Sequence, residues 1–136
     1  RAFDDCQMCE MYSCLEAQNG LNCGDRGYFR GYGQKYCARF SAITGEFMSD
    51  AGRQWLANVR SCLLDEVESL LEDTSSCKDI RQGAFDSHPG CYVQSGLCSL
   101  PPSDWGHIVA TISPWDNDLK QVILSGAGCL QEWLNL

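Results

Sequence analysis

The sequence predicts an all-α fold, a compact disulfide-stapled domain with about five to six helices and no significant sheet. Three observations support this prediction. Apolar residues recur at helical spacing in several segments, no segment alternates cleanly between apolar and polar residues over a β-branched run, and the 136 residues include ten cysteines. A chain of this length is ordinary for one domain, so we expect residues 1–136 to form a single unit.

The longest helix is predicted between Ala51 and Glu72. Ser49 is a good N-cap residue, Asp50 favours the positive end of the helix dipole, and the pattern ends at Thr74. Apolar side chains recur along this segment with the 3.6-residue repeat of an amphipathic helix: Trp55, Leu56, Val59, Cys62, Leu63, Val67, Leu70 and Leu71.

Shorter helices are predicted before this segment. Phe3–Glu16 and Gly33–Ile43 both have helical patterns. The stretch Gly20–Gly33 between them contains five glycines, so we expect it to form an irregular loop.

Further helices are predicted after the longest one. A helix over Cys77–Phe85 is expected to stop at His88-Pro89-Gly90, followed by a short turn over Cys91–Cys98. Pro101-Pro102 then marks the end of this turn and the start of the next predicted helix. Two final helices are indicated by apolar residues at helical spacing, first at Trp105, Ile108, Val109 and Ile112, and then within residues 117–136 at Leu119, Val122, Ile123, Leu130 and Trp133.

The cysteines favour a disulfide framework formed in an oxidising compartment. They are spread from Cys6 to Cys129 and their number is even, so every sulfur has a possible partner within the chain. A zinc site needs closely spaced ligand pairs, and only Cys6 and Cys9 form a CxxC. This CxxC lies at the N-terminus with no strand before it, which also argues against a thioredoxin-like site. We therefore expect neither a metal nor another cofactor.

Charge and targeting signals narrow the set of partners. The net charge is −8, so a polyanion is repelled at long range, and neither nucleic acid nor an anionic membrane surface is an expected partner. No apolar run reaches the roughly eighteen residues of a membrane span.

The chain begins at Arg1 without an initiator Met or a signal peptide, as we expect of a mature form whose leader has been removed. The cysteines, and not a visible targeting signal, therefore predict a secreted, extracellular protein.

The sequence lacks the parts of a conventional active site. His88 and His107 are its two histidines, and neither a GxSxG nor an HExxH motif is present. The stretches 32–37 and 87–92 invite comparison with secreted phospholipases A2, which pair a glycine-rich calcium loop with a His-Asp beside cysteines. However, Pro89 follows His88 where that enzyme needs a calcium-binding Asp. We therefore predict no catalytic residue.

An acidic run follows the middle of the longest predicted helix. Its residues interleave with the apolar stripe and should lie on the solvated face of the helix. They do not have EF-hand spacing, so solubility is the simpler interpretation and a weak cation site is the alternative. The run consists of Asp65, Glu66, Glu68, Glu72 and Asp73.

Several of the cysteines stand in recognisable motifs at fixed spacings. An early cysteine is followed by Leu-Glu, and a Gly-basic-x-aromatic motif precedes a Cys-aliphatic pair by ten residues. A cysteine at the head of a predicted helix then precedes a Cys-Tyr by fourteen residues and another cysteine by seven more. The residues concerned are Cys14-Leu15-Glu16, Gly52-Arg53-Gln54-Trp55, Cys62-Leu63, Val67, Cys77, Cys91-Tyr92, Cys98 and Cys129. This cysteine order and the residues beside it resemble the stanniocalcin family of secreted polypeptide hormones, in which the same motifs occur.

The resemblance implies a disulfide pairing and leaves no cysteine to link two subunits. The chain also lacks the glycosylation sequon typical of the family, and we expect a monomer or a noncovalent homodimer. Trp133 and Leu134 are the residues proposed for a noncovalent interface, because exposed apolar residues are the usual basis of such pairing. The implied bonds join Cys6 to Cys14, Cys9 to Cys37, Cys23 to Cys77, Cys62 to Cys91, and Cys98 to Cys129.

The resemblance also implies a function. It predicts a secreted, non-enzymatic, hormone-like signalling protein that binds a protein partner, either a receptor or an extracellular proteinase. The alternative is a venom toxin that uses the same scaffold to modulate an ion channel or receptor. A secreted enzyme is a third interpretation, which a deep pocket with converging polar groups would support.

Overall fold

The computed structural model describes residues 8–42, 48–74 and 76–111 together with Cys129, and within these residues the chain is helical and contains no strand. The predicted all-α class is confirmed. The α-helices are α2 (Met11–Gln18), α3 (Lys35–Ala42), α4 (Asp50–Asp73), α5 (Cys77–Gln94) and α6 (Pro102–Thr111). Two short 3-10 helices, η1 (Met8–Glu10) and η3 (Leu97–Ser99), and a π-helix, η2 (Phe29–Gln34), complete the described elements.

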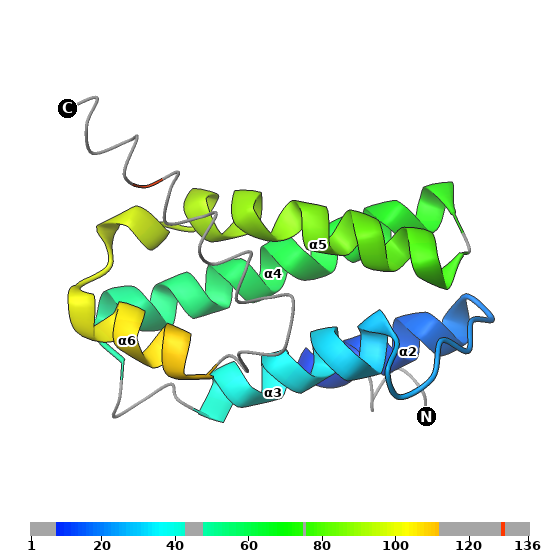
Figure 1. The fold of residues 1–136 in the computed structure, drawn as a ribbon, viewed down its shortest axis with the longest axis horizontal. Coiled ribbons are helices and arrows are strands. Elements are labelled where there is room, and N and C mark those ends of the chain that lie inside the picture. The colour runs from blue at the N-terminus through cyan, green and yellow to red at the C-terminus, as the bar shows by residue number, and fades with distance from the viewer. Residues whose placement is uncertain (1–7, 43–47, 75, 112–128, 130–136) are drawn as a thin grey trace.

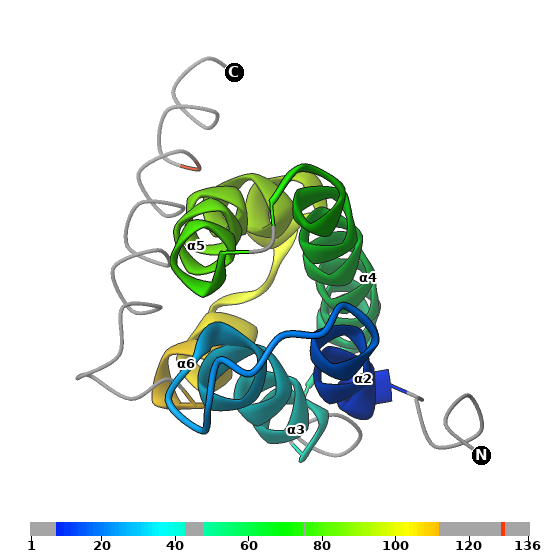
Figure 2. The ribbon, with the colours of Figure 1, turned by 90° about the vertical axis from the view of Figure 1, so that its right-hand side faces the viewer.

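The helices pack as pairs around a shared interior. The long helices α4 and α5 lie side by side and antiparallel, joined by a short connection (Figure 1). The pair formed by α2 and the continuous η2–α3 segment lies against them, and α6 lies beside α3 (Figure 2). The interior is therefore enclosed by helix faces, and side chains from α2, η2–α3, α4, α5 and α6 meet there.

Helix α4 follows the predicted pattern closely. The Ser49 hydroxyl accepts a hydrogen bond of 3.0 Å from the Gly52 N–H, as an N-cap should. Trp55, Leu56 and Val59 are buried, as is Val67 further along, whereas all five residues of the acidic run are exposed. The predicted amphipathic helix and its solvated acidic face are confirmed.

Helix α5 corrects the prediction that the chain stops at His88-Pro89-Gly90. One continuous helix runs from Cys77 to Gln94, with Pro89 inside it. Proline removes one backbone hydrogen bond, but Phe85, His88 and Tyr92 from this same helix are buried against its neighbours. Tertiary packing on both sides of Pro89 thus stabilises a helix that local sequence rules predict to break.

The glycine-rich stretch is likewise more regular than predicted. The irregular loop ends near Gly27, and the π-helix from Phe29 to Gln34 leads directly into α3. A Cβ atom on Gly33 would lie 2.4 Å from a ring carbon of Tyr12. Glycine at this position therefore allows two helical segments to approach closely and does not mark a loop.

The ends of the chain are only partly described. Helix α6 confirms the helix predicted around Trp105 and Ile108. Part of the predicted helix Phe3–Glu16 and nearly all of the predicted helix within residues 117–136 lie outside the described residues. Cys129 is the exception within that final segment, and it is buried.

The core consists of two aromatic-rich clusters. One lies where α3, α4, α5 and α6 meet and includes Phe40, Trp55 and Tyr92. The other lies nearer α2 and includes Tyr12 and Phe85. The partly buried Tyr32 packs against both clusters, so the two form one continuous interior.

We predict that Gly33→Ala lowers the free energy of unfolding by about 1–3 kcal/mol, because the added methyl overlaps the buried Tyr12 ring. Gly106→Ala in α6 is the matched control, since its Cβ would meet nothing within 4 Å. It should raise stability by about 0.5–1 kcal/mol through helix propensity. Urea unfolding followed by tryptophan fluorescence measures both changes. Equal effects of the two substitutions would contradict the close packing of α2 against η2.

Candidate functional site

Disulfide bonds cross-link the helices at four described places. The bonds join Cys9 of η1 to Cys37 of α3, Cys23 to Cys77 at the start of α5, Cys62 of α4 to Cys91 of α5, and Cys98 of η3 to Cys129. These four pairs coincide with pairs that the family resemblance implies. Cys14 is also disulfide-bonded, and its expected partner, Cys6, lies outside the described residues.

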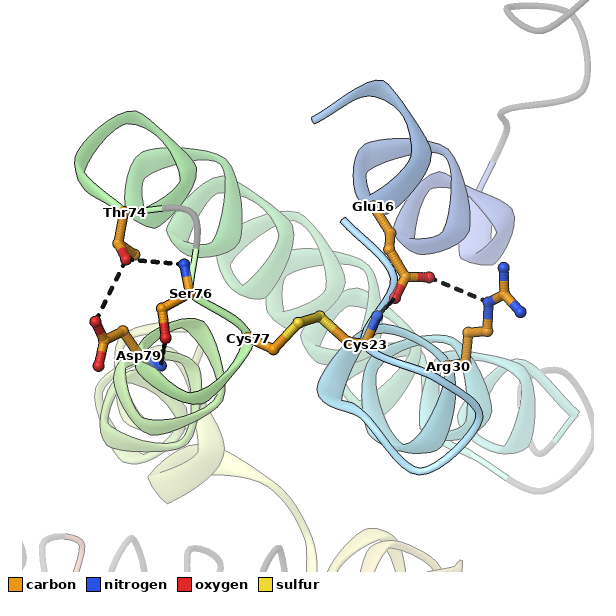
Figure 3. The surroundings of a disulfide bond; sticks show 7 residues. All are labelled: Glu16, Cys23, Arg30, Thr74, Ser76, Cys77 and Asp79. Carbon is orange, nitrogen blue, oxygen red and sulfur yellow. Dashed lines mark hydrogen bonds and ion pairs between the residues drawn. A yellow bond between two sulfur atoms is a disulfide. The ribbon is translucent and has the colours of Figure 1, made fainter. Parts of the chain in front are cut away.

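The Cys23–Cys77 bond closes the longest of these four loops, with a sequence separation of 54 residues. In the chain-entropy account such a loop contributes about 4 kcal/mol by restricting the unfolded chain. Both ends of the bond are fixed by hydrogen bonds (Figure 3). On one side Ser76 caps α5 by accepting a hydrogen bond of 3.3 Å from the Asp79 N–H.

Glu16 fixes the other side of this bond. Its side chain is buried, and its carboxylate accepts a hydrogen bond of 2.8 Å from the Cys23 N–H and one of 3.1 Å from Arg30 Nε (Figure 3). A buried carboxylate must be paired in this way, because its desolvation is costly. Glu16 therefore positions the loop that carries Cys23 and also orients the guanidinium group of Arg30.

His88 is a core residue and not the turn residue that the sequence predicted. Its side chain is 4% exposed, and Nε2 lies 2.7 Å from the hydroxyl oxygen of Tyr28, which is also buried. The rings of Phe85 and Tyr92 pack against it at centroid distances of 5.2 and 5.8 Å. In this setting the imidazole satisfies a buried tyrosine hydroxyl and fills space between aromatic rings.

His107 lies apart from His88, on α6, and is partly exposed. Its backbone carbonyl accepts a hydrogen bond of 2.7 Å from the Thr111 hydroxyl. The two histidines therefore differ in their surroundings: His88 is packed among aromatic rings in the core, and His107 is partly exposed on α6.

The interior contains an aromatic-lined cavity of about 40 Å³. This volume accommodates no more than a few water molecules and is far below the size of a site for an organic substrate. Its lining includes the rings of Tyr12, Tyr28, Tyr32, Tyr36, Trp55 and Tyr92. We interpret the cavity as a packing feature of the aromatic core.

A surface groove of about 490 Å³ is present in the described part of the chain. Its lining comes from the turn before η2, from η2 itself, from the start of α3 and from α5. Four of the lining residues are basic, although the chain as a whole is acidic. The groove is lined by Asp25, Arg26, Arg30, Gly31, Tyr32, Lys35 and Arg81, and we call it the basic groove.

Two arginines in the basic groove are held by neighbouring side chains. Arg30 is bound at Nε by the buried Glu16, and its Nη1 lies 3.6 Å from the Asp25 carboxylate. The Arg81 guanidinium lies over the rings of Tyr32 and Phe85, at 5.1 and 5.6 Å from their centroids. Such contacts reduce the side-chain entropy that a bound ligand would otherwise have to remove.

The sequence predicts neither a metal site nor a membrane span, and it predicts a noncovalent interface near the C-terminus. Within the described ranges, no group of three or more His, Cys, Asp or Glu residues is arranged to hold a metal ion, the acidic run included. In the same part of the chain, no helix combines the length and apolar character of a membrane span. Trp133 and Leu134, the residues proposed for a noncovalent interface, lie outside the described residues.

The basic groove was missed by the sequence reasoning, although part of its signal is present. Residues 26–39 hold four of the ten basic residues of an acidic chain. That local concentration could have indicated an anion site. Arg81 could not have been assigned to it, because only the packing of α5 against η2 brings this residue to the groove.

We predict that Glu16→Ala lowers the free energy of unfolding by about 2 kcal/mol, because the Cys23 N–H loses its acceptor and Arg30 loses its ion pair. Glu68→Ala on the exposed face of α4 is the control and should change stability by less than about 0.5 kcal/mol. Chemical unfolding at neutral pH measures both. A neutral effect of Glu16→Ala would contradict its role in fixing the loop.

The histidines should differ in their contribution to stability. His88→Gln should cost about 1–3 kcal/mol, because it removes a buried ring and weakens the pairing of the Tyr28 hydroxyl. His107→Gln should cost less than about 1 kcal/mol, since the side chain is partly exposed. Thermal and urea unfolding of each single variant test this order, and a larger effect at His107 would contradict it.

Comparison with known proteins gives no family assignment. No protein-family model, no curated protein and no solved structure matches this chain. Inference about its function therefore rests on the geometry described above and on the cysteine pattern of the sequence.

Proposed function

We propose that this chain is a secreted signalling protein of the stanniocalcin type, which acts by binding an extracellular protein partner and not by catalysis. The observation that supports this best is the cysteine pairing. Four described disulfides join the same cysteines that the family resemblance pairs, and ten cysteines allow hundreds of alternative pairings. A shared cross-link pattern of this kind is a strong reason to propose a shared scaffold.

The oxidised framework supports the proposed location. Disulfides of this number persist in secreted and extracellular proteins and are rare in the reducing cytosol. They join segments from η1 to the region of Cys129, so they constrain most of the described fold. A rigid surface of this kind binds a partner with little loss of conformational entropy.

The surroundings of His88 support a proposal of binding over catalysis. The Tyr28 ring and hydroxyl, together with Phe85 and Tyr92, pack around the imidazole. A general base must come within hydrogen-bond reach of its substrate, and a histidine packed in this way is better suited to a structural role. Fold alone does not identify the partner, and a receptor and an extracellular proteinase are both consistent with the proposal.

The test is affinity capture from the extracellular fluid of the source tissue, with bound proteins identified by mass spectrometry. We expect the native protein to retain one extracellular protein in stoichiometric amount. The reduced and alkylated chain should lose it, because the framework is then absent. Measurable turnover of a phospholipid, peptide or glycan by the native protein, lost in His88→Gln with the fold preserved, would overturn the proposal.

The same capture separates a hormone from a toxin on this scaffold. Expression of the transcript in several tissues together with capture of an endogenous receptor or proteinase would support the hormone. A transcript confined to a venom gland, together with binding to an ion channel of another species, would favour the toxin. Both outcomes keep binding as the mode of action.

A further inference from the structure

We propose that the basic groove binds a doubly charged tetrahedral oxyanion, the sulfate or phosphate group of a small molecule. This inference rests on the groove alone and is independent of the proposed function. The residues that would contact the anion are Arg26, Arg30, Lys35 and Arg81, which reach the groove from the turn, the π-helix, α3 and α5 respectively.

Basic residues are concentrated at this groove. The chain carries a net charge of −8, yet four of its ten basic residues line the groove, together with the single acidic residue Asp25. A concave surface with an excess of one sign of charge concentrates counter-ions locally, even where the net charge of the protein opposes them at long range. The long-range repulsion predicted from composition therefore applies to polyanions and leaves a local site for a small anion.

The lining of the groove has the chemistry of an oxyanion site. Guanidinium groups bind oxyanions through pairs of parallel N–H donors. Three arginines reach the groove from the turn, η2 and α5, so an anion bound between them would be contacted from separate elements. A tetrahedral group presents oxygens in several directions, whereas a planar carboxylate presents two in one plane. The volume of about 490 Å³ also falls within the range of small-molecule sites, so the groove has room for part of the molecule that carries the anion.

Two of the arginines are preorganised by their neighbours. Glu16 binds Nε of Arg30, and the rings of Tyr32 and Phe85 support the guanidinium of Arg81. Both arginines are therefore oriented before a ligand arrives, which lowers the entropic cost of binding.

A π-helix forms one wall of the groove. π-helical turns are uncommon and often occur at functional sites. In η2 the π-helical segment includes both Arg30 and Tyr32. A Cβ atom on Gly31 would lie 3.0 Å from the backbone of Arg26 and of Asp25, so this close approach favours glycine. The unusual backbone thus places Arg30 beside the turn that carries Arg26.

Asp25 would compete with a bound anion for the Arg30 guanidinium group. Its carboxylate lies 3.6 Å from Nη1 of Arg30, and its side chain is 93% exposed. An exposed ion pair of this length is weak and is easily exchanged for a ligand with two charges. Removal of the Asp25 charge should therefore tighten anion binding.

The experiment titrates the native protein with sodium sulfate or sodium phosphate at constant ionic strength set with sodium chloride. Two-dimensional NMR follows the backbone amides of the groove and the Nε–H groups of the arginines. We expect saturable shifts at Gly31 and Arg81. Arg26→Gln and Arg81→Gln should each weaken binding roughly tenfold, and Asp25→Asn should tighten it severalfold.

Matched control variants distinguish a specific anion site from the effect of a change in the net charge of the protein. Lys78→Gln changes the net charge by the same amount as Arg81→Gln and lies on the same helix outside the groove lining, so it should leave the affinity within twofold. Asp65→Asn is the corresponding control for Asp25→Asn. Unchanged amide spectra elsewhere in each variant show that the fold is preserved.

Further arms identify the source of the anion. Glucosamine 6-sulfate and glucose 6-phosphate are titrated beside the free ions, and tighter binding of either ester supports the site and names its ligand chemistry. Binding of the free ions alone, with the predicted variant effects, supports a site for inorganic anions. Shifts that are absent, or that Lys78→Gln weakens as much as Arg81→Gln does, would overturn the proposal.

Discussion

The Cys62–Cys91 disulfide joins α4 to α5 and fixes the register of the two longest helices of the described structure. Around this bond the helices bury Trp55 and Tyr92 against each other, and Trp55 Nε1 donates a hydrogen bond of 2.9 Å to the Tyr92 carbonyl. The remaining elements pack on this pair. α5 supplies Phe85 and His88 to the core shared with η2, and it places Arg81 beside the π-helix.

The two long helices differ in how well local sequence rules predict them. Helix α4 was predictable almost to the residue, because its apolar stripe, its N-cap and its acidic face all indicate the same helix. The continuity of α5 through Pro89 was not, because the stabilising contacts come from residues far away in the chain. The same holds for His88, whose partner Tyr28 is 60 residues distant. Local patterns thus identified individual helices, and tertiary packing decided where one of them ended.

The basic groove likewise combines a local pattern that the sequence shows with a contribution that only the fold produces. The concentration of basic residues between Arg26 and Arg39 is visible in the sequence, but the contribution of α5 depends on the bundle. The buried Glu16 gave no sequence signal, since an acidic residue on a short helix is usually solvated. Charge is therefore segregated in the folded protein in a way that composition conceals. The acidic face of α4 is exposed to solvent, and the basic groove is formed where η2 meets α5.

The central claim is that the disulfide framework pairs specific helices, and non-reducing peptide mapping tests it most directly. Cleavage after Glu66, Glu68 or Glu72 separates Cys62 from Cys77, and cleavage after Tyr92 separates Cys91 from Cys98. A digest that combines trypsin with glutamate-specific and aromatic-specific proteases therefore places Cys23, Cys62, Cys77, Cys91, Cys98 and Cys129 on separate peptides. We expect linked peptides that join Cys62 to Cys91, Cys23 to Cys77 and Cys98 to Cys129. A digest in which Cys62 is free, or is bonded to a cysteine other than Cys91, would contradict the account.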